Sequence, residues 1–216
     1  MELVVVPAYN EAANIGRVIR DLFQHGWKNV LVVDDGSVDD TAGLAFGAGA
    51  RVVSHFSNRG QGAALETGNE YARRKGFDVV VHFDGDGQFD AADIKGAVDK
   101  IFAGYNLVLG SRFLDDRSKI PGFKKYFILP IARIINYLFT GIKLGDVHNG
   151  FRVLDKVALE KIVISQSGMA HNSEIVAGIK KFGLKYCEHP VKVEYFRYGQ
   201  GLGGGVKIIF DWIFKK

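Results

Sequence analysis

The chain has 216 residues, of which 28 are Lys or Arg, 24 are Asp or Glu, and 47% are hydrophobic. This composition is that of a globular domain with a sizeable core, and it excludes disordered, collagen-like and disulfide-stapled classes. The single cysteine, Cys187, excludes an internal disulfide and a cysteine-based zinc site, which fits a reducing compartment. The first residues lack the basic region of a signal peptide, and no apolar run reaches 18 residues, so we expect neither a signal peptide nor a spanning helix.

Apolar runs alternate with helical patterns through the first 110 residues. Runs typical of strands cover 3–6, 30–33, 51–54, 78–83 and 106–109, and helical patterns cover 15–23, 39–46, 60–75 and 91–102. This alternation predicts an α/β fold with a Rossmann-like, mostly parallel sheet flanked by helices. Ligands of such sheets bind beyond the carboxyl ends of the strands.

The second half has a less regular pattern. We expect amphipathic helices within 123–142, a strand at 151–154, helices at 157–163 and 173–182, and a strand at 185–195. A mobile glycine-rich loop is expected at 199–205 and a terminal helix at 206–214. No linker divides the chain, so residues 1–216 are predicted to form one domain.

Positive charge is concentrated between Arg112 and Lys143, a stretch with seven basic and two acidic residues. A basic zone of this kind suggests an anionic partner, but no nucleic-acid motif accompanies it. Aromatic and aliphatic residues interleave with the charges, which favours a lipid interface for the amphipathic segment 121–143. A buried helix pair or a dimer surface remains an alternative for this segment.

Two acidic clusters follow predicted strands. At 84–88 the sequence reads Asp-Gly-Asp-Gly-Gln, and at 34–37 it reads Asp-Asp-Gly-Ser. Carboxylates two residues apart in extended chain can approach one divalent cation. A calcium loop of the EF-hand type is excluded, because Phe89 and Lys95 stand where that loop needs glycine and glutamate. The alternative is an acidic turn before the helix at 91–102, with Asp90 as its cap.

Other phosphate-binding motifs are absent from the sequence. The glycine pairs at 47–49 and 60–62 lack the third glycine of a dinucleotide fingerprint, and no Walker-type Gly-Lys-Ser/Thr occurs. Spacing alone supports no Ser-His-Asp arrangement.

Four segments, taken in order, resemble the inverting family-two glycosyltransferases of the GT-A fold. They are Pro-Ala-Tyr-Asn-Glu at 7–11, Val-Asp-Asp-Gly-Ser at 33–37, Asn-Arg-Gly-Gln-Gly-Ala-Ala at 58–64, and the acidic segment 84–88. Within that family the chain is similar to the dolichyl (polyprenyl) phosphate mannose synthase branch. This similarity is carried by Ser-Arg-Phe at 111–113, by Asp146 with Asn-Gly-Phe-Arg at 149–152, and by Arg197 with Gly199.

The sequence departs from the family pattern at three places. Gly85 stands where the metal segment usually has alanine, Asn149 where branch members often have serine, and Gly-Gln-Gly-Leu at 199–202 where they have Gly-Glu-Ser-Lys. These departures bear on the sugar and the acceptor.

The resemblance implies roles for individual residues. Nucleotide binding would fall to Pro7, Tyr9, Glu11, Asp35, Arg59, Gly60 and Asp84. Asp84, Asp86 and Gln88 would bind Mg²⁺ or Mn²⁺ against the donor diphosphate, and the cation would stabilise the leaving group. Asp86, Arg112 and Arg152 are the expected catalytic residues. Arg112, Arg133 and Arg197 are expected to bind the acceptor phosphate, together with Arg152, because guanidinium groups suit phosphate oxygens.

The implied activity is transfer of mannose from GDP-mannose to dolichyl or polyprenyl phosphate with inversion. A lipid phosphate is anionic and needs no general base, whereas a hydroxyl acceptor does. One alternative is therefore a UDP-sugar donor, such as UDP-glucose, with a polyprenyl-phosphate or saccharide hydroxyl acceptor in cell-envelope synthesis, with Glu174 or Asp146 as the base for a hydroxyl. A second is a non-catalytic module that binds nucleotide sugar.

The expected partners follow from this activity. They are a GDP- or UDP-hexose, a polyprenyl phosphate and the membrane surface, with room for a membrane-anchoring subunit and no nucleic acid. We expect a cytoplasmic protein, peripheral on the cytoplasmic face of the membrane.

Overall fold

The computed structural model describes residues 1–118, 137, 141–146, 149–168 and 170–194. The strands are β1 (Glu2–Ala8), β2 (Val30–Asp34), β3 (Arg51–Ser54), β4 (Val79–His82), β5 (Leu107–Ser111), β6 (Arg152–Asp155) and β7 (Tyr186–Pro190). The helices are α1 (Ile15–Gln24), α2 (Thr41–Gly47), α3 (Gln61–Lys75), α4 (Asp93–Phe102), α6 (Lys156–Lys161) and α7 (Ala170–Phe182).

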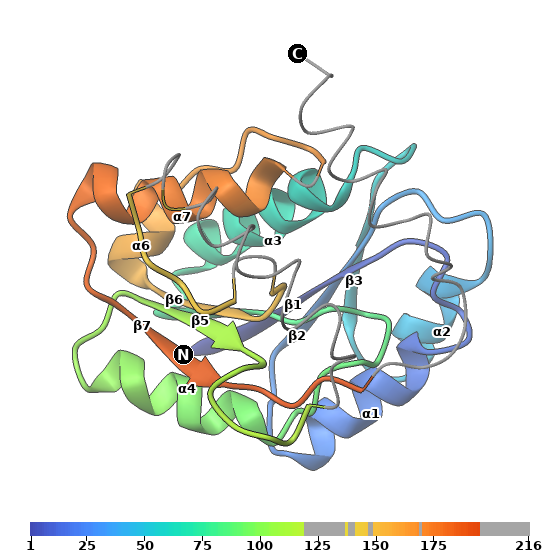
Figure 1. Ribbon diagram of the computed structural model, residues 1–216. Coiled ribbons are helices and arrows are strands. Elements are labelled where there is room, and N and C mark those ends of the chain that lie inside the picture. The colour runs from blue at the N-terminus through green and yellow to red at the C-terminus, as the bar shows by residue number, and fades with distance from the viewer. Residues whose placement is uncertain (119–136, 138–140, 147–148, 169, 195–216) are drawn as a thin grey trace, which may run out of the picture.

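The strands form one sheet between two layers of helices (Figure 1). Its order is β3-β2-β1-β4-β6-β5-β7, and every neighbouring pair is parallel except those made by β6. Helices α1 and α4 cover one face, and α3, α6 and α7 cover the other. The prediction of a mostly parallel α/β sheet flanked by helices is confirmed.

Successive side chains of the strands pack alternately into the two apolar cores, one on each face of the sheet. In β1, Val4 and Val6 pack under α1, while Leu3 and Val5 pack under α3. Successive residues of a strand face opposite sides of the sheet, so a strand covered on both faces is apolar throughout. This is why the buried strands could be identified from short continuous apolar runs.

The sheet brings distant segments to one edge. The carboxyl ends of β1, β2, β4 and β5 meet there because these strands run in the same direction. Strand β6 runs the opposite way, so its first residue, Arg152, reaches the same edge beside His82 of β4. Residues 149–151, just before β6, therefore join the loops that follow the other strands.

Several boundaries differ from the prediction. Helix α2 begins at Thr41 rather than at 39, because the Asp39 carboxylate accepts a hydrogen bond from the Thr41 backbone at 3.1 Å. Helix α4 begins at Asp93, two residues later than expected, after a turn in which Asp90 accepts a bond from Ala92. Helix α6 spans 156–161 where 157–163 was expected, helix α7 begins three residues earlier than expected, and β7 is limited to 186–190.

Parts of the prediction lie outside the described residues. Of the amphipathic segment 121–143, only 137 and 141–143 are described, and the loop 199–205 and helix 206–214 are not. Within the described part of the chain, no helix has the length and hydropathy needed to cross a bilayer.

The contact between α3 and β1 allows a test of the packing. A Cβ on Gly68 of α3 would lie 2.2 Å from Cγ1 of Val5, whose side chain is fully buried. We expect Gly68→Ala to lower the free energy of unfolding by about 1–3 kcal/mol through overpacking. Gly47→Ala in α2, where the added Cβ meets nothing within 4 Å, is the control. Urea unfolding measures both, and equal midpoints for Gly68→Ala and wild type would contradict this packing.

Candidate active site

The loops after β1 and β2 are bound to each other. The Asn10 backbone N–H donates to Ser37 Oγ at 2.9 Å, and Asn10 Oδ1 accepts from the Val38 N–H at 2.9 Å. The Glu11 N–H donates to Thr41 Oγ1 at 2.8 Å. Asn10 itself has a φ of 56°, a left-handed conformation that asparagine tolerates. These bonds fix Glu11 at the rim of the sheet edge.

The buried Asp35 side chain binds the backbone of the loop before α3. Its carboxylate accepts bonds from the backbone N–H groups of Arg59 at 2.9 Å and Gly60 at 2.7 Å, and it contacts His55 Nδ1 at 2.7 Å. The residue is 3% exposed. Both carboxylate oxygens therefore hold the loop that carries the family motif at 58–64, so any nucleoside contact of Asp35 would share oxygens with this loop.

The acidic segment 84–88 leaves the carboxyl end of β4. Gln61 Nε2 donates to Asp84 Oδ1 at 2.9 Å, and Asp86 Oδ1 accepts from the Gln88 N–H at 3.0 Å. A Cβ on Gly150 would lie only 2.3 Å from Asp84 Oδ2, so the loop before β6 passes directly against this carboxylate. The Gln61 side chain of α3 and the backbone of the loop before β6 thus meet at Asp84.

Three carboxylates of this region repel one another. Burial raises the pKa of Asp84 to about 7, and the Asp86 charge adds to this rise. Burial also raises the pKa of Asp86, and it raises that of Glu11, where the Asp86 charge contributes. Such crowding of ionised groups is relieved by a cation.

The oxygens of Asp84, Asp86 and Gln88 are the ligand type that Mg²⁺ and Mn²⁺ prefer. Among the described residues, no group of three or more His, Cys, Asp or Glu side chains could hold a metal ion. A cation here would therefore need further oxygens, such as those of a diphosphate. The donor set fits a metal that is shared with a ligand.

Arg112 is held on the other side of the edge by Asp146. Its Nε and Nη2 each donate to an Asp146 oxygen at 2.6 Å, and its backbone N–H donates at 3.1 Å. The guanidinium lies 5.7 Å from the Phe113 ring centre. Asp146 is itself fixed, because Glu188 of β7 accepts bonds from the backbone N–H groups of Gly145 and Asp146. Arg112 thus has a fixed orientation and a balanced charge.

Arg152 lies beneath the edge rather than on it. The side chain is 1% exposed, and its Nη2 donates to the Asn149 carbonyl at 2.9 Å and to Asn172 Oδ1. Burial lowers its pKa to about 10, against the opposing charges of Asp84 and Asp146. In this arrangement Arg152 is a buried counter-charge for those two carboxylates and does not reach solvent.

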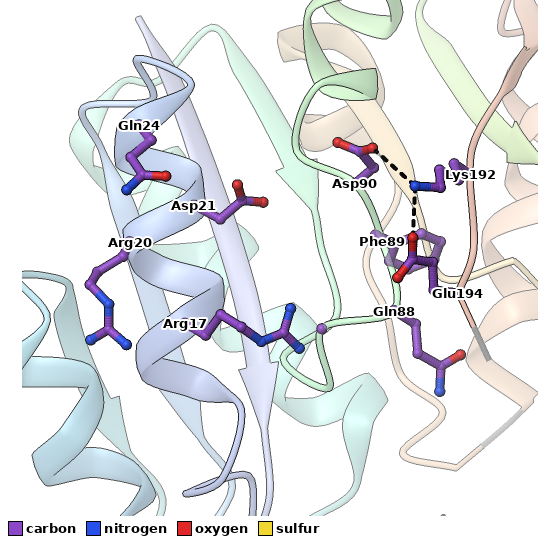
Figure 2. A pocket seen from close by; sticks show the side chains of 10 residues that line it. Arg17, Arg20, Asp21, Gln24, Gln88, Phe89, Asp90, Lys192 and Glu194 are labelled. Atoms are coloured by element: carbon purple, nitrogen blue, oxygen red, sulfur yellow. Dashed lines mark ion pairs between the residues drawn. The ribbon is translucent and has the colours of Figure 1, made fainter. Parts of the chain in front are cut away.

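Helix α1 contributes an arginine that the sequence did not indicate. Figure 2 shows Arg17 projecting from α1 towards the segment after β4, across an open pocket of about 380 Å³. A Cβ on Gly87 would lie 2.2 Å from its Nη2, and its charge opposes the rise in the Asp86 pKa. No motif marked Arg17, because it lies on the polar face of an ordinary amphipathic helix.

On the opposite wall of this pocket, the segment after β7 is paired with the end of the acidic segment. The Glu194 N–H donates to the Gln88 carbonyl at 2.9 Å, and Phe89 pairs with Val193. Lys192 pairs with Glu194 at 2.7 Å and with Asp90 at 4.0 Å, as Figure 2 shows. Of the predicted residues, the structure links Asp35 to Arg59 and Gly60 by hydrogen bonds. It brings Glu11, Asp86 and Arg152 within range of the Asp84 charge. Arg133 and Arg197 lie outside the described residues.

Several contacts of the site were not predicted. The sequence included Gln61, Asn149 and Gly150 in motifs but assigned them no role, and it gave no signal for Glu188 as a structural support. Gln61 could have been found, since it is the first residue of α3 and directly follows the loop held by Asp35. The others depend on which strands are neighbours.

Comparison with known proteins places the chain in a family. A family model described as "Glycosyl transferase family 2" matches residues 3–163. The UDP-N-acetylglucosamine–dolichyl-phosphate N-acetylglucosaminyltransferase of Methanococcus voltae is 30% identical over 236 residues, covering 98% of this chain and 93% of the relative. The polyprenol monophosphomannose synthase of Mycolicibacterium smegmatis is 31% identical over 180 residues, covering 76% and 64%.

A solved structure agrees with the fold. The glucosyl-3-phosphoglycerate synthase of Mycobacterium tuberculosis, in complex with Mn²⁺, uridine diphosphate and glucosyl-3-phosphoglycerate, aligns with a TM-score of 0.73 at 20% identity, covering 99% of this chain and 78% of that chain. At this identity the likeness supports the GT-A architecture alone. The predicted resemblance is confirmed: the chain belongs to glycosyl transferase family 2.

Proposed function

We propose that this chain transfers a hexose from a nucleoside diphosphate sugar to a polyprenyl phosphate, with inversion at the anomeric carbon. The observation that carries the proposal is the pair of crowded carboxylates, Asp84 and Asp86, at the carboxyl end of β4. Burial disfavours the ionised form of both carboxylates, and for Asp84 the Asp86 charge adds to this effect. A divalent cation would stabilise the ionised forms, and a donor diphosphate would complete its ligands. The names of the Methanococcus voltae and Mycolicibacterium smegmatis relatives support the lipid phosphate as acceptor.

The donor would lie along the edge formed by the first strands. Pro7, Tyr9, Glu11, Asp35, Arg59 and Gly60 are proposed to bind the nucleotide, with Asp84 beside the diphosphate. Asp84, Asp86 and Gln88 would hold Mg²⁺ or Mn²⁺, which when bound neutralises charge on the leaving nucleoside diphosphate. Asp86 holds the Gln88 backbone, so both potential ligands belong to one fixed turn.

The contacts of two carboxylates favour a phosphate acceptor over a hydroxyl. Asp146, one candidate base, is occupied by Arg112. Glu174, the other, accepts bonds from the backbone N–H groups of Ser165 at 2.9 Å and Gln166 at 3.0 Å. A hydroxyl acceptor needs an available base, whereas a lipid phosphate attacks as an anion. Arg112 is proposed to orient that phosphate, together with Arg133 and Arg197.

The sugar and base are proposed as mannose and guanine. The resemblance to the mannose synthase branch and the name of the Mycolicibacterium smegmatis relative support this donor. The name of the Methanococcus voltae relative supports UDP-N-acetylglucosamine instead. Turnover of radiolabelled GDP-mannose, UDP-glucose and UDP-N-acetylglucosamine with short polyprenyl phosphates or saccharides decides among them. No product with any lipid phosphate would contradict the proposed acceptor.

We also propose a location for the reaction. A polyprenyl phosphate resides in the membrane, so the chain would work as a peripheral protein on its cytoplasmic face, with the basic segment 121–143 at the interface. A membrane-anchoring subunit is a further proposed partner. Flotation with vesicles that contain anionic lipids tests this location.

Substitution of the central carboxylate tests the metal site. We expect Asp86→Asn to reduce kcat/KM by about 100-fold or more, because a bound metal supplies several kcal/mol of charge stabilisation. Its Mn²⁺ affinity, measured by titration calorimetry with nucleoside diphosphate, should fall in parallel. Asp90→Asn is the matched control, since Asp90 lies on the same segment but binds Ala92 and Lys192. Full activity of Asp86→Asn would contradict the site.

The raised pKa of Asp84 predicts a pH dependence of stability without metal. An unfolded aspartate titrates near pH 4, whereas burial raises the pKa of Asp84 to about 7 in the fold. The folded state therefore favours the protonated form, and stability is lost as pH rises from about 4 to about 7. In EDTA, the free energy of unfolding of wild type should fall relative to Asp84→Asn across this range. A difference that stays constant from pH 4 to pH 8 would contradict the assignment.

Substitution of Arg112 tests the acceptor site. Arg112→Lys keeps the charge but loses the two-pronged contact with Asp146. We expect kcat/KM for the lipid phosphate to fall about 10- to 100-fold, from the loss of about 1.5–3 kcal/mol of charged hydrogen bonding. Binding of nucleoside diphosphate with Mn²⁺ should not change. The control is Arg73→Lys on α3, an arginine that pairs with Glu66 and has the same 19% side-chain exposure. An equal loss in both variants would contradict the role.

A further inference from the structure

A cluster of polar side chains lies inside the apolar core beneath the active site. It consists of Asn69 on α3, His82 on β4, Arg152 on β6 and Asn172 on α7, none of which is more than 4% exposed. Apolar residues of the core under α3 and α7 surround it, including Val80, Leu154 and Ile175. Burial of so many polar groups costs free energy unless they serve one another. The free-energy cost of burying these four polar side chains therefore has to be offset by interactions among them.

Its hydrogen bonds are only partly made within the protein. His82 Nε2 and Asn69 Oδ1 are 2.9 Å apart, and Arg152 Nη2 donates to Asn149 and Asn172. Four buried atoms of this cluster have no hydrogen-bond partner among the described residues: Arg152 Nε and Nη1, His82 Nδ1 and Asn69 Nδ2. The Arg152 and Asn69 nitrogens are donors, and His82 Nδ1 can accept.

His82 can supply a hydrogen-bond acceptor to Arg152. A protonated ring would place a second buried positive charge beside the Arg152 guanidinium, with no acceptor for its Nδ1 proton among the described residues, so the neutral ring is the form that fits. Because Asn69 Oδ1 accepts, Nε2 carries the proton and Nδ1 keeps a lone pair. His82 is the direct cross-strand partner of Arg152 in the β4–β6 register. The ring thus offers an acceptor beside a guanidinium that lacks acceptors.

We propose that His82 and Asn69 are positioning residues for Arg152. Asn69 sets the tautomer of His82, and Nδ1 of His82 binds the guanidinium through one internal water molecule, which can serve two to four polar partners. The guanidinium is thereby held between Asp84 and Asp146, the carboxylates that shape the metal segment and the Arg112 pair. One buried cation then fixes both sides of the reaction centre. This inference rests on the proposed function, because it assigns Asp84 to the metal site.

The competing explanation is that His82 only fills the core. Val80 provides the comparison, since it lies two residues earlier on the same face of β4 and pairs with Leu154, two residues along the same ladder. Val80→Ala disturbs the packing between β4, β6 and α3 without touching a polar group. A loss of function that follows packing alone would be shared by this variant.

The experiment compares His82→Val, His82→Gln and Val80→Ala. Titration calorimetry measures the Kd for Mn²⁺ in the presence of nucleoside diphosphate, and thermal unfolding measures stability. We expect His82→Val to weaken Mn²⁺ binding about 10- to 100-fold, the range typical for groups that orient metal ligands. His82→Gln, whose amide can donate to Asn69 and accept from the water, should stay within about threefold of wild type. Val80→Ala should unfold at lower temperature with an unchanged Kd.

Every other outcome of this experiment contradicts one stated part of the proposal. A Kd of His82→Val within twofold of wild type, or equal losses in His82→Val and Val80→Ala, would overturn the positioning role alone. A loss in His82→Gln as large as that in His82→Val would overturn the tautomer argument. If His82→Val does not fold, Asn69→Leu removes the Oδ1 acceptor that sets the tautomer of His82, and it decides by the same Kd. Wild type that binds no Mn²⁺ with nucleotide would overturn the proposed function as well.

Discussion

The crowding of carboxylates at the carboxyl end of β4 is the constraint on which the site depends. Asp84 and Asp86 are held close together by a tight turn, and burial raises the pKa of both. A fold tolerates such repulsion only where something opposes it. Here Gln61, Arg17 and Arg152 act on these carboxylates from three different elements. The protein is thus arranged to present negative charge at one edge, as binding of a cation requires.

Because β6 runs in the opposite direction to β4 and β5, the residues around its start also lie at this edge. An all-parallel arrangement would place the start of that strand at the far end of the sheet. Because β6 is antiparallel to β4 and β5, Gly150 passes against Asp84 and Arg152 enters the core beside His82. The same reversal leads Asp146 to Arg112 at the end of β5. The Asp84 side and the Asp146–Arg112 side of the edge therefore share one buried cation, Arg152.

The accuracy of the sequence reading varied with the kind of residue. Elements that can be recognised from adjacent residues were predicted well. The buried strands, the helix at 15–23 and the acidic turn at 84–88 were placed to within a few residues. Contacts that depend on which strands are neighbours were not predicted. Asp35 was expected at a nucleoside and also holds the loop at 59–60, and Arg152, expected as a catalytic group, lies buried among Asn149 and Asn172.

By itself the sequence determined the α/β class, the family resemblance and the segments that reach the active edge. These follow from periodicity and from residues adjacent along the chain, which are local properties. Only the tertiary structure decided that Arg112 pairs with Asp146, that Gly150 lies against Asp84, and that His82 stands beside Arg152. Such pairs join residues far apart in sequence. They depend on strand order and direction, which hydrophobic pattern does not encode.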